Sequence, residues 1–375
     1  MPARSRQATK LCKKSAVQQA SPTTELPQGS FGRPNLMFFS ELSSSALRRT
    51  LLHNQLIDDL ARQGYGIALG LPDLSVEQAE MVDLLNLKGV AVVAWLQLPI
   101  SEGLWLNLKN YPQVIERYRA FRAWAQQHNL RFAAVGLDIE PPPREVDRIL
   151  HWGLRDIARR LWLAHENVLY PAARSAYIDL IAEMHHDGYE VHVYQLPLVA
   201  DDRRAGTTIM QRALDVVDLP ADVEVLMCYS SLPVAQLGND LGGALIASYG
   251  PAADAIGVGS IGGSTALDGG DGLPQLSWEA LERDLLLAAR HTDIMYIYSL
   301  EGCVERDLLT RIIEIDWYQE PKLLLWRRAL IGTLRVALLI ILLVARFSRR
   351  LLAWLGWLVA ALMLFRQLRA WQREH

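Results

Sequence analysis

The stretch Phe132-Ala-Ala-Val-Gly-Leu-Asp-Ile-Glu-Pro-Pro142 decides how the rest of the chain is interpreted. Its side chains alternate, and alternation places successive residues of a strand on opposite faces. One face carries Val135, Leu137 and Ile139, and the other carries Ala134, Gly136, Asp138 and Glu140. The two carboxylates are then roughly 6–7 Å apart along the backbone. Charged groups are costly at the end of a core strand, so they indicate a functional site, with a structural hydrogen-bonded pair as the alternative.

The same pattern of an apolar run followed by a helical segment recurs along residues 34–320. The apolar runs cover residues 36–39, 65–70, 90–96, 132–140, 190–194, 223–229, 255–259 and 293–298. The longest helical section, 144–187, is expected to break near Pro171. Eight strand–helix units of this length predict an α/β fold, a (β/α)8 TIM barrel. A doubly wound sheet is the main alternative, but no Gly-rich phosphate loop follows the first strand.

Charge divides the chain into three parts. Residues 1–33 carry about +5 and residues 321–375 about +9, which leaves −17 for 34–320 given the overall −3. The first part is predicted to be a disordered basic leader, with a transit peptide as the alternative, and the middle part is predicted to be the barrel. An acidic barrel argues against nucleic acid as a partner, because phosphate backbones need a basic surface. The basic ends suit anionic lipid instead.

The C-terminal part, 321–375, is predicted to associate with a membrane through its apolar tail. Residues 329–345 are apolar apart from Arg335, and residues 351–365 are apolar throughout. Each segment is somewhat shorter than the roughly 20 residues that span a bilayer. Flanking tryptophans and arginines are typical of interfacial anchors. We expect two membrane helices or a hairpin turning at 346–350, with a pair of buried soluble helices as the alternative.

The same features predict where the protein resides. The leader lacks the apolar core of a signal peptide, so the barrel is expected in the cytoplasm, with the tail in the inner (cytoplasmic) membrane. Arginines flank the tail at every point, so charge bias does not set its orientation. Cys12, Cys228 and Cys303 fit neither a disulfide framework nor a zinc site, which favours a reduced compartment.

Candidate site residues follow from the fold, because the active site of a (β/α)8 barrel lies at the C-terminal ends of its strands. The residues expected there are Glu41, Gln97, Trp105, Asp138, Glu140, Gln195, Tyr229, Tyr298 and Glu301. Paired carboxyl groups with flat rings and amides are the chemistry of a saccharide site. The tyrosines could instead be core aromatics, and Trp105 a packing residue. Glu41 and Glu301 could be solvated loop acids.

Other chemistries have weaker support in the sequence. Strand alternation gives Tyr298 and Glu301 opposite parity, so at most one of them is expected to face inward. His192 is in mid-strand and no metal-ligand set appears. No Gly-x-Ser-x-Gly elbow is present, and no motif predicts a cofactor.

Three short motifs resemble those of the family 18 glycoside hydrolases (chitinase-like). Gly136-Leu-Asp-Ile-Glu140 is similar to the fourth-strand signature Asp-Gly-x-Asp-x-Asp-x-Glu. Met227-Cys-Tyr229 looks like the Met-x-Tyr of strand six, and Ile297-Tyr-Ser-Leu-Glu-Gly302 resembles the aromatic-Ser-Leu-Asp ending of strand eight. All three fall on the strands where the family has them. The resemblance covers the barrel and not the tail.

The fourth-strand motif departs from the family pattern. Val135 stands where the family has its first Asp, Glu140 where it has its third Asp, and Pro142 where it has its catalytic Glu. In the family the sugar's own N-acetyl group attacks, which implies Asp138 or Glu140 as the orienting group and Tyr229 as the oxygen stabiliser. Two functions follow. One is a membrane-anchored barrel that binds and hydrolyses a saccharide, with Glu140 as acid or base; the other is an inactive barrel that binds a glycan or protein at the membrane.

Overall fold

The computed structural model describes residues 33–53, 55–142, 145, 154–231, 241–260 and 275–374. Almost all of the predicted leader lies outside these ranges. Within them, parallel strands pair in sequence order, and the eighth pairs with the first, so the sheet is a closed barrel. The strands are β1 (Asn35–Ser40), β2 (Gly66–Leu71), β3 (Val92–Leu96), β4 (Ala134–Ile139), β5 (Glu190–Gln195), β6 (Val223–Met227), β7 (Ala255–Gly259) and β8 (Ile294–Tyr298). This confirms the predicted (β/α)8 fold.

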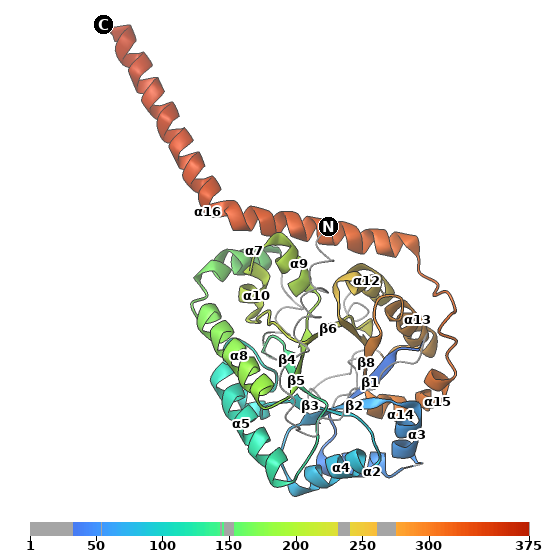
Figure 1. Ribbon diagram of the computed structural model, residues 1–375. Coiled ribbons are helices and arrows are strands. Elements are labelled where there is room, and N and C mark those ends of the chain that lie inside the picture. Colours follow the sequence, from blue (N-terminus) through green and yellow to red (C-terminus); the bar gives the residue numbers. More distant parts are fainter. Residues whose placement is uncertain are drawn as a thin grey trace, which may run out of the picture.

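Helices surround the barrel (Figure 1). They are α2 (Ser44–Leu51), α3 (Leu56–Gln63), α4 (Val76–Leu87), α5 (Tyr111–Gln127), α7 (Leu154–Leu163), α8 (Leu169–His186), α9 (Leu198–Ala205), α10 (Ile209–Leu214), α12 (Gly242–Tyr249), α13 (Trp278–Ala288), α14 (Leu300–Glu305), α15 (Leu308–Ile313) and α16 (Leu325–Glu374). The expected break near Pro171 is confirmed, because α7 and α8 separate at 164–168 and Pro171 lies in the first turn of α8. Proline is tolerated there since it interrupts no helical hydrogen bond.

The alternation predicted for the fourth strand places its side chains in two separate cores. Val135, Leu137 and Ile139 belong to the large core between the barrel and its helices. Ala134 belongs to a second core inside the barrel, together with the rings of Phe39, Trp95, Tyr194 and Tyr296. The ring centroid of Phe39 lies 4.9 Å from that of Trp95 and 4.8 Å from that of Tyr194. The interior is therefore filled by aromatic rings up to the level where the strands end.

The C-terminal part differs from the predicted hairpin. Residues 346–350, the expected turn, are helical within α16. The chain makes no reversal there, since each peptide continues one helix. The first part of α16 lies along the outside of the barrel beside α9 and α12, and the second part projects away from the barrel (Figure 1). The predicted apolar helical tail is thus present as one helix rather than two antiparallel ones.

Candidate functional site at the barrel mouth

Glu41, directly after β1, is held at the C-terminal mouth of the barrel by Tyr298 at the end of β8 and by Gln97 directly after β3. The Tyr298 hydroxyl donates to its Oε2 at 2.6 Å, and the Gln97 amide donates to its Oε1 at 2.7 Å. Burial raises the pKa of Glu41 to about 7, the two hydrogen bonds oppose that rise, and the charge on Glu301 adds to it. Glu41 is therefore poised to hold or release a proton near neutral pH, and it is no solvated loop acid.

Asp138 and Glu140 lie on the same inward face at the end of β4. Burial raises the pKa of Glu140 to about 7, and the charge on Glu41 raises it further. Burial also raises the pKa of Asp138 well above its usual value, with further contributions from Glu140 and Glu41. The charges on Glu41 and Glu140 each raise the pKa of a neighbouring carboxyl group, so the three groups are electrostatically coupled. Like charges in a buried site cannot all be ionised at once, so the group retains protons at neutral pH.

Three buried polar side chains lie beside one another: Asp138, Trp95 and Tyr194. Burial raises the pKa of Asp138, and a hydrogen bond with Trp95 opposes that rise. Tyr194 interacts with the side chain of Tyr296. Asp138 and Tyr194 are paired neighbours in the register of β4 and β5. All three lie on the interior face of adjacent strands.

Tyr229 and Tyr298 form an aromatic wall near the carboxyl groups. Their ring centroids lie 5.9 Å apart at an interplanar angle of 60°. Tyr229 is buried, and burial together with the charges on Asp138, Glu140 and Glu41 raises its pKa well above the usual value. Its hydroxyl therefore stays protonated and can donate a hydrogen bond to an oxygen in the mouth.

Glu301 reaches the same site, contrary to the expectation from strand parity. Its Oε1 accepts a hydrogen bond from the backbone N–H of Glu41 at 3.4 Å, while Tyr298 contacts the side chain of Glu41. Alternation does not apply across this pair, because β8 ends at Tyr298 and Glu301 lies in the first turn of α14. Burial raises the pKa of Glu301. Both residues thus belong to the mouth.

Gln195 and Trp105 are also predicted site residues: Gln195 lies at the end of β5, and Trp105 lies beside β4. Gln195 is the last residue of β5, and alternation puts it on the face opposite to Tyr194. Neither polar atom of its amide has a partner among the described residues. Trp105 is nearly buried beside β4, where its neighbour Leu106 donates to the Asp138 carbonyl at 2.9 Å and accepts from the Glu140 N–H at 3.1 Å. This segment fixes the backbone that carries the two acids.

Two glycines make room for site side chains. A Cβ on Gly136 would overlap the hydroxyl of Tyr194. A Cβ on Gly70 would lie 2.9 Å from Oε1 of Gln97, the residue that holds Glu41. Tyr194 and Trp95 lie beside Asp138 and are candidate members of the site as well. The available signal was their parity: each lies on the inward face of a strand adjacent to Asp138.

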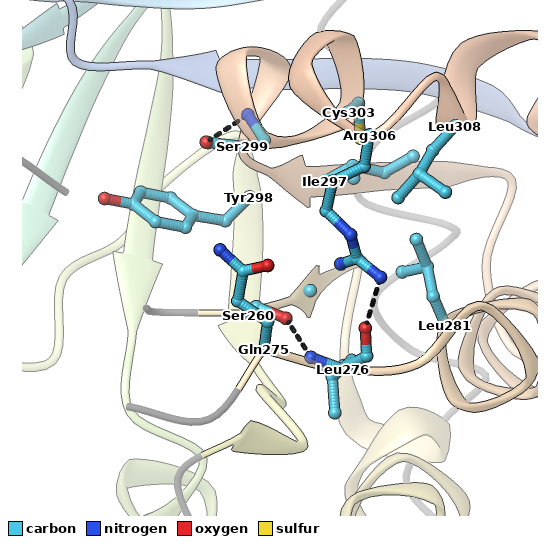
Figure 2. A pocket seen from close by; sticks show the side chains of 12 residues that line it. Ser260, Gln275, Leu276, Leu281, Ile297, Tyr298, Ser299, Cys303, Arg306 and Leu308 are labelled. Atoms are coloured by element: carbon cyan, nitrogen blue, oxygen red, sulfur yellow. Dashed lines mark hydrogen bonds between the residues drawn. The ribbon is translucent and has the colours of Figure 1, made fainter. Parts of the chain in front are cut away.

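A small pocket lies between the ends of β7 and β8 and helices α13 and α14, and of the candidate site residues only Tyr298 lines it (Figure 2). Arg306 donates to the Leu276 carbonyl at 2.8 Å, and the Ser260 hydroxyl accepts from the Leu276 N–H at 2.8 Å. In Figure 2 the ring of Tyr298 extends away from Arg306. Burial raises the pKa of the lining thiol Cys303 to about 12, so it is not a nucleophile at neutral pH.

No cluster of three or more His, Cys, Asp or Glu side chains in the described part of the chain is arranged to hold a metal ion. His192 lies inside the barrel, where its Nδ1 and the Tyr296 hydroxyl form a hydrogen bond. In the tail, Leu325–Ser348 is long and apolar enough to cross a membrane by length and composition, and Leu352–Arg366 is a shorter apolar stretch of the same helix.

Comparisons with known proteins find no matching family model and no matching curated protein. The chain is similar to several solved structures. A GH18 chitinase from Pseudoalteromonas aurantia is 10% identical, with a TM-score of 0.45 over 75% of this chain and 99% of that chain. The PgaB (BpsB) glycoside hydrolase domain from Bordetella bronchiseptica is 11% identical, with a TM-score of 0.45 over 77% and 100%. An L-ribulose 3-epimerase is 13% identical, with a TM-score of 0.38 over 85% and 98%.

Proposed function

We propose that this protein is a membrane-attached saccharide-binding barrel that hydrolyses a glycosidic bond at its C-terminal mouth. The observation that carries the proposal is the cluster of buried carboxyl groups Glu41, Asp138 and Glu140 beside the rings of Tyr229 and Tyr298. Carboxyl groups supply the acid and base for glycoside cleavage, and flat rings stack on sugar faces.

Glu140 acts as the acid or base in this scheme. Its pKa of about 7 leaves a large share of both protonation states at neutral pH, which is the condition that general acid–base catalysis favours. Asp138, held protonated or sharing a proton with Glu140, orients the reacting group of the substrate. Tyr229 donates a hydrogen bond to an oxygen that gains charge in the transition state.

The remaining site residues bind and position the sugar. Tyr298 stacks against it, while Gln97, Glu301, Gln195 and Trp105 supply polar contacts or shape to the mouth. Glu41 contributes the second proton-exchanging carboxyl group, because its pKa is also about 7. Two such groups allow one to donate a proton to the leaving group while the other accepts one from water.

A second candidate function is a barrel that binds a glycan or a protein at the membrane without cleaving it. Pro142 favours it, since proline cannot supply the proton that a carboxyl group at that position would. The acidic barrel carries −17 over residues 34–320, so nucleic acid is not proposed as a partner for either function. The basic, apolar tail attaches the barrel to membrane lipid.

The test assays a panel of N-acetylated and plain glycosides for both binding and product release. Hydrolysis predicts turnover on at least one glycoside and its loss in Glu140→Gln with binding retained. Binding without turnover in the parent protein would favour the second function. Equal turnover in Glu140→Gln and the parent would end the proposed role of Glu140.

A further inference from the structure

Arg335, the one charged residue in 329–345, contacts the barrel. Its Nε and Nη2 donate to Oδ1 of Asp201 at 2.9 and 2.8 Å, and its Nη1 donates to the Ser248 hydroxyl at 3.1 Å. The guanidinium also lies 3.8 Å from the ring centroid of Tyr249. Arg335 therefore ties α16 to both α9 and α12 through a planar, multiply bonded contact.

The carboxylate of Asp201 is buried, so it depends on Arg335 to neutralise its charge. It is 1% exposed, and its Oδ2 accepts the Tyr249 hydroxyl at 2.6 Å. If the helix moved off the barrel, Asp201 would keep its burial and lose its cation. Removing one member of a buried ion pair is strongly destabilising, because it leaves an uncompensated charge. The ion pair thus opposes any arrangement in which this part of α16 separates from the barrel.

Apolar residues on the same face of α16 extend the contact in both directions. Ile331 packs against Leu241 and Ala244, at one end of the contact. Leu342 is buried against Ala205 and Ile209, at the other end. Ile331, Arg335 and Leu342 are separated by four and seven residues, which places them on one side of a helix. The first half of α16 is therefore docked over several turns.

The opposite face of the docked half is apolar and exposed. Val336, Ile340 and Val344 are each more than half exposed, at 54%, 56% and 56%. Beyond them, the described side chains of 352–366 are exposed all round the helix. The sequence has ten basic residues and no acidic residue over 321–373. An exposed apolar surface on a segment whose charged residues are all basic matches an anionic lipid bilayer.

We propose that residues 325–348 do not cross the bilayer but lie along its surface, with the outer apolar face in the interfacial region and the barrel on the opposite side. The second half of α16 then enters the bilayer, since it leaves the barrel on the side away from the docked face (Figure 1). Its apolar stretch 352–366 is about 22 Å long at helical rise, which is shorter than the ~30 Å hydrocarbon core. This inference rests on the membrane attachment in the proposed function and adds the geometry of that attachment.

The experiment measures the depth of the docked half in vesicles of phosphatidylcholine and phosphatidylglycerol. Single cysteines at Val336, Ile340 and Val344 carry an environment-sensitive fluorophore, in a full-length Cys12→Ser background. Cys228 and Cys303 are buried and so do not compete for the label. Quenching by shallow and by deep nitroxide lipids gives the depth at each position. A surface helix predicts one shallow depth at all three positions.

A spanning helix predicts a different profile, because eight residues rise about 12 Å between positions 336 and 344. A graded depth would overturn the surface placement while leaving membrane attachment intact. Labels that remain in water would overturn both the placement and the attachment, without bearing on saccharide chemistry. Arg335→Met is expected to turn the uniform depth into a graded one. Arg350→Met, which removes the same charge from an exposed position, is expected to keep it uniform. A uniform depth in Arg335→Met would overturn the role of Arg335.

Discussion

The hydroxyl of Tyr298 donates a 2.6 Å hydrogen bond to Oε2 of Glu41, and this contact joins the last strand of the barrel to the first at its mouth. Strand β8 pairs directly with β1, so the two residues come together across 257 positions of sequence. The hydrogen bond also lowers the pKa of Glu41, against the larger rise that burial causes. The closure of the barrel therefore contributes to the pKa of a site residue.

Replacing Tyr298 by Phe should raise the pKa of Glu41 above about 7, because the hydrogen bond that stabilises its charged form is lost. A hydrogen bond to a charged group is worth about 1.5–3 kcal/mol, which corresponds to roughly 1–2 pKa units. Carboxyl carbon NMR of the labelled protein measures the shift. Tyr318→Phe, at a 78% exposed residue, is the matched control. An unchanged Glu41 titration in Tyr298→Phe would contradict the assignment.

The buried carboxyl groups should make the protein less stable as pH rises. The unfolded chain releases the Glu41 proton above about 4.5, whereas the folded chain keeps it until about 7. The unfolded state then binds fewer protons across this window, so the free energy of unfolding falls from pH 4.5 to 7 and levels off above it. Glu41→Gln should therefore restore about 1–3 kcal/mol of the free energy of unfolding at pH 8. At pH 4 it should restore none.

Urea unfolding of the parent protein and of Glu41→Gln at pH 4 and pH 8 measures this difference. Glu116→Gln, an exposed change on α5, should leave the pH dependence as it is. A Glu41→Gln variant that is equally destabilised at both pH values would show that the pKa of Glu41 is the same in the folded and unfolded states, and would contradict the raised pKa.

Gly136→Ala should displace the ring of Tyr194 from beside Asp138. The added Cβ would overlap the Tyr194 hydroxyl, and the ring is buried among Phe39, Trp95 and Tyr296. Overpacking of this kind costs about 1–3 kcal/mol of stability. Gly332→Ala meets nothing within 4 Å on α16 and should be neutral or stabilising by up to ~1 kcal/mol. Thermal unfolding of both variants checks the prediction, and equal stabilities would contradict it.

Arg335→Met should lower the free energy of unfolding by about 3–5 kcal/mol, since it leaves Asp201 buried without its cation. The double variant Asp201→Asn/Arg335→Met should recover part of this loss, because no charge is then left unpaired. Denaturant unfolding of the two single variants and the double variant gives the coupling energy. Additive losses would mean that the two side chains do not stabilise each other.

The sequence carried enough information for the barrel. Alternation at Val135, Leu137 and Ile139, repeated in eight apolar runs, predicted the fold and the inward direction of Asp138. Alternation failed at Glu301, because helix α14 begins two residues after β8 ends and the parity rule stops there. Alternation also could not show that Glu41 is buried, because its burial depends on contacts with Gln97 and Tyr298, which lie far away in the sequence.

The tail shows a second limit of sequence patterns. Hydropathy identified the two apolar segments, but Arg346 to Arg350 suggested a turn where the helix continues. The reason for Arg335 within the first apolar segment is not visible in the sequence, because its partner Asp201 lies 134 residues earlier in the chain. Contacts between such distant residues are set by packing, which a local pattern does not record.

The central claim is that the buried carboxyl groups at the mouth cleave a glycosidic bond. Its most direct test is the rate of product release from N-acetylated oligosaccharides by the parent protein, Glu140→Gln and the exposed control Glu116→Gln. We predict a loss of at least ~100-fold in Glu140→Gln, as expected for removal of a general acid or base, and no change in the control. A Glu140→Gln variant that releases product at the parent rate would contradict the account.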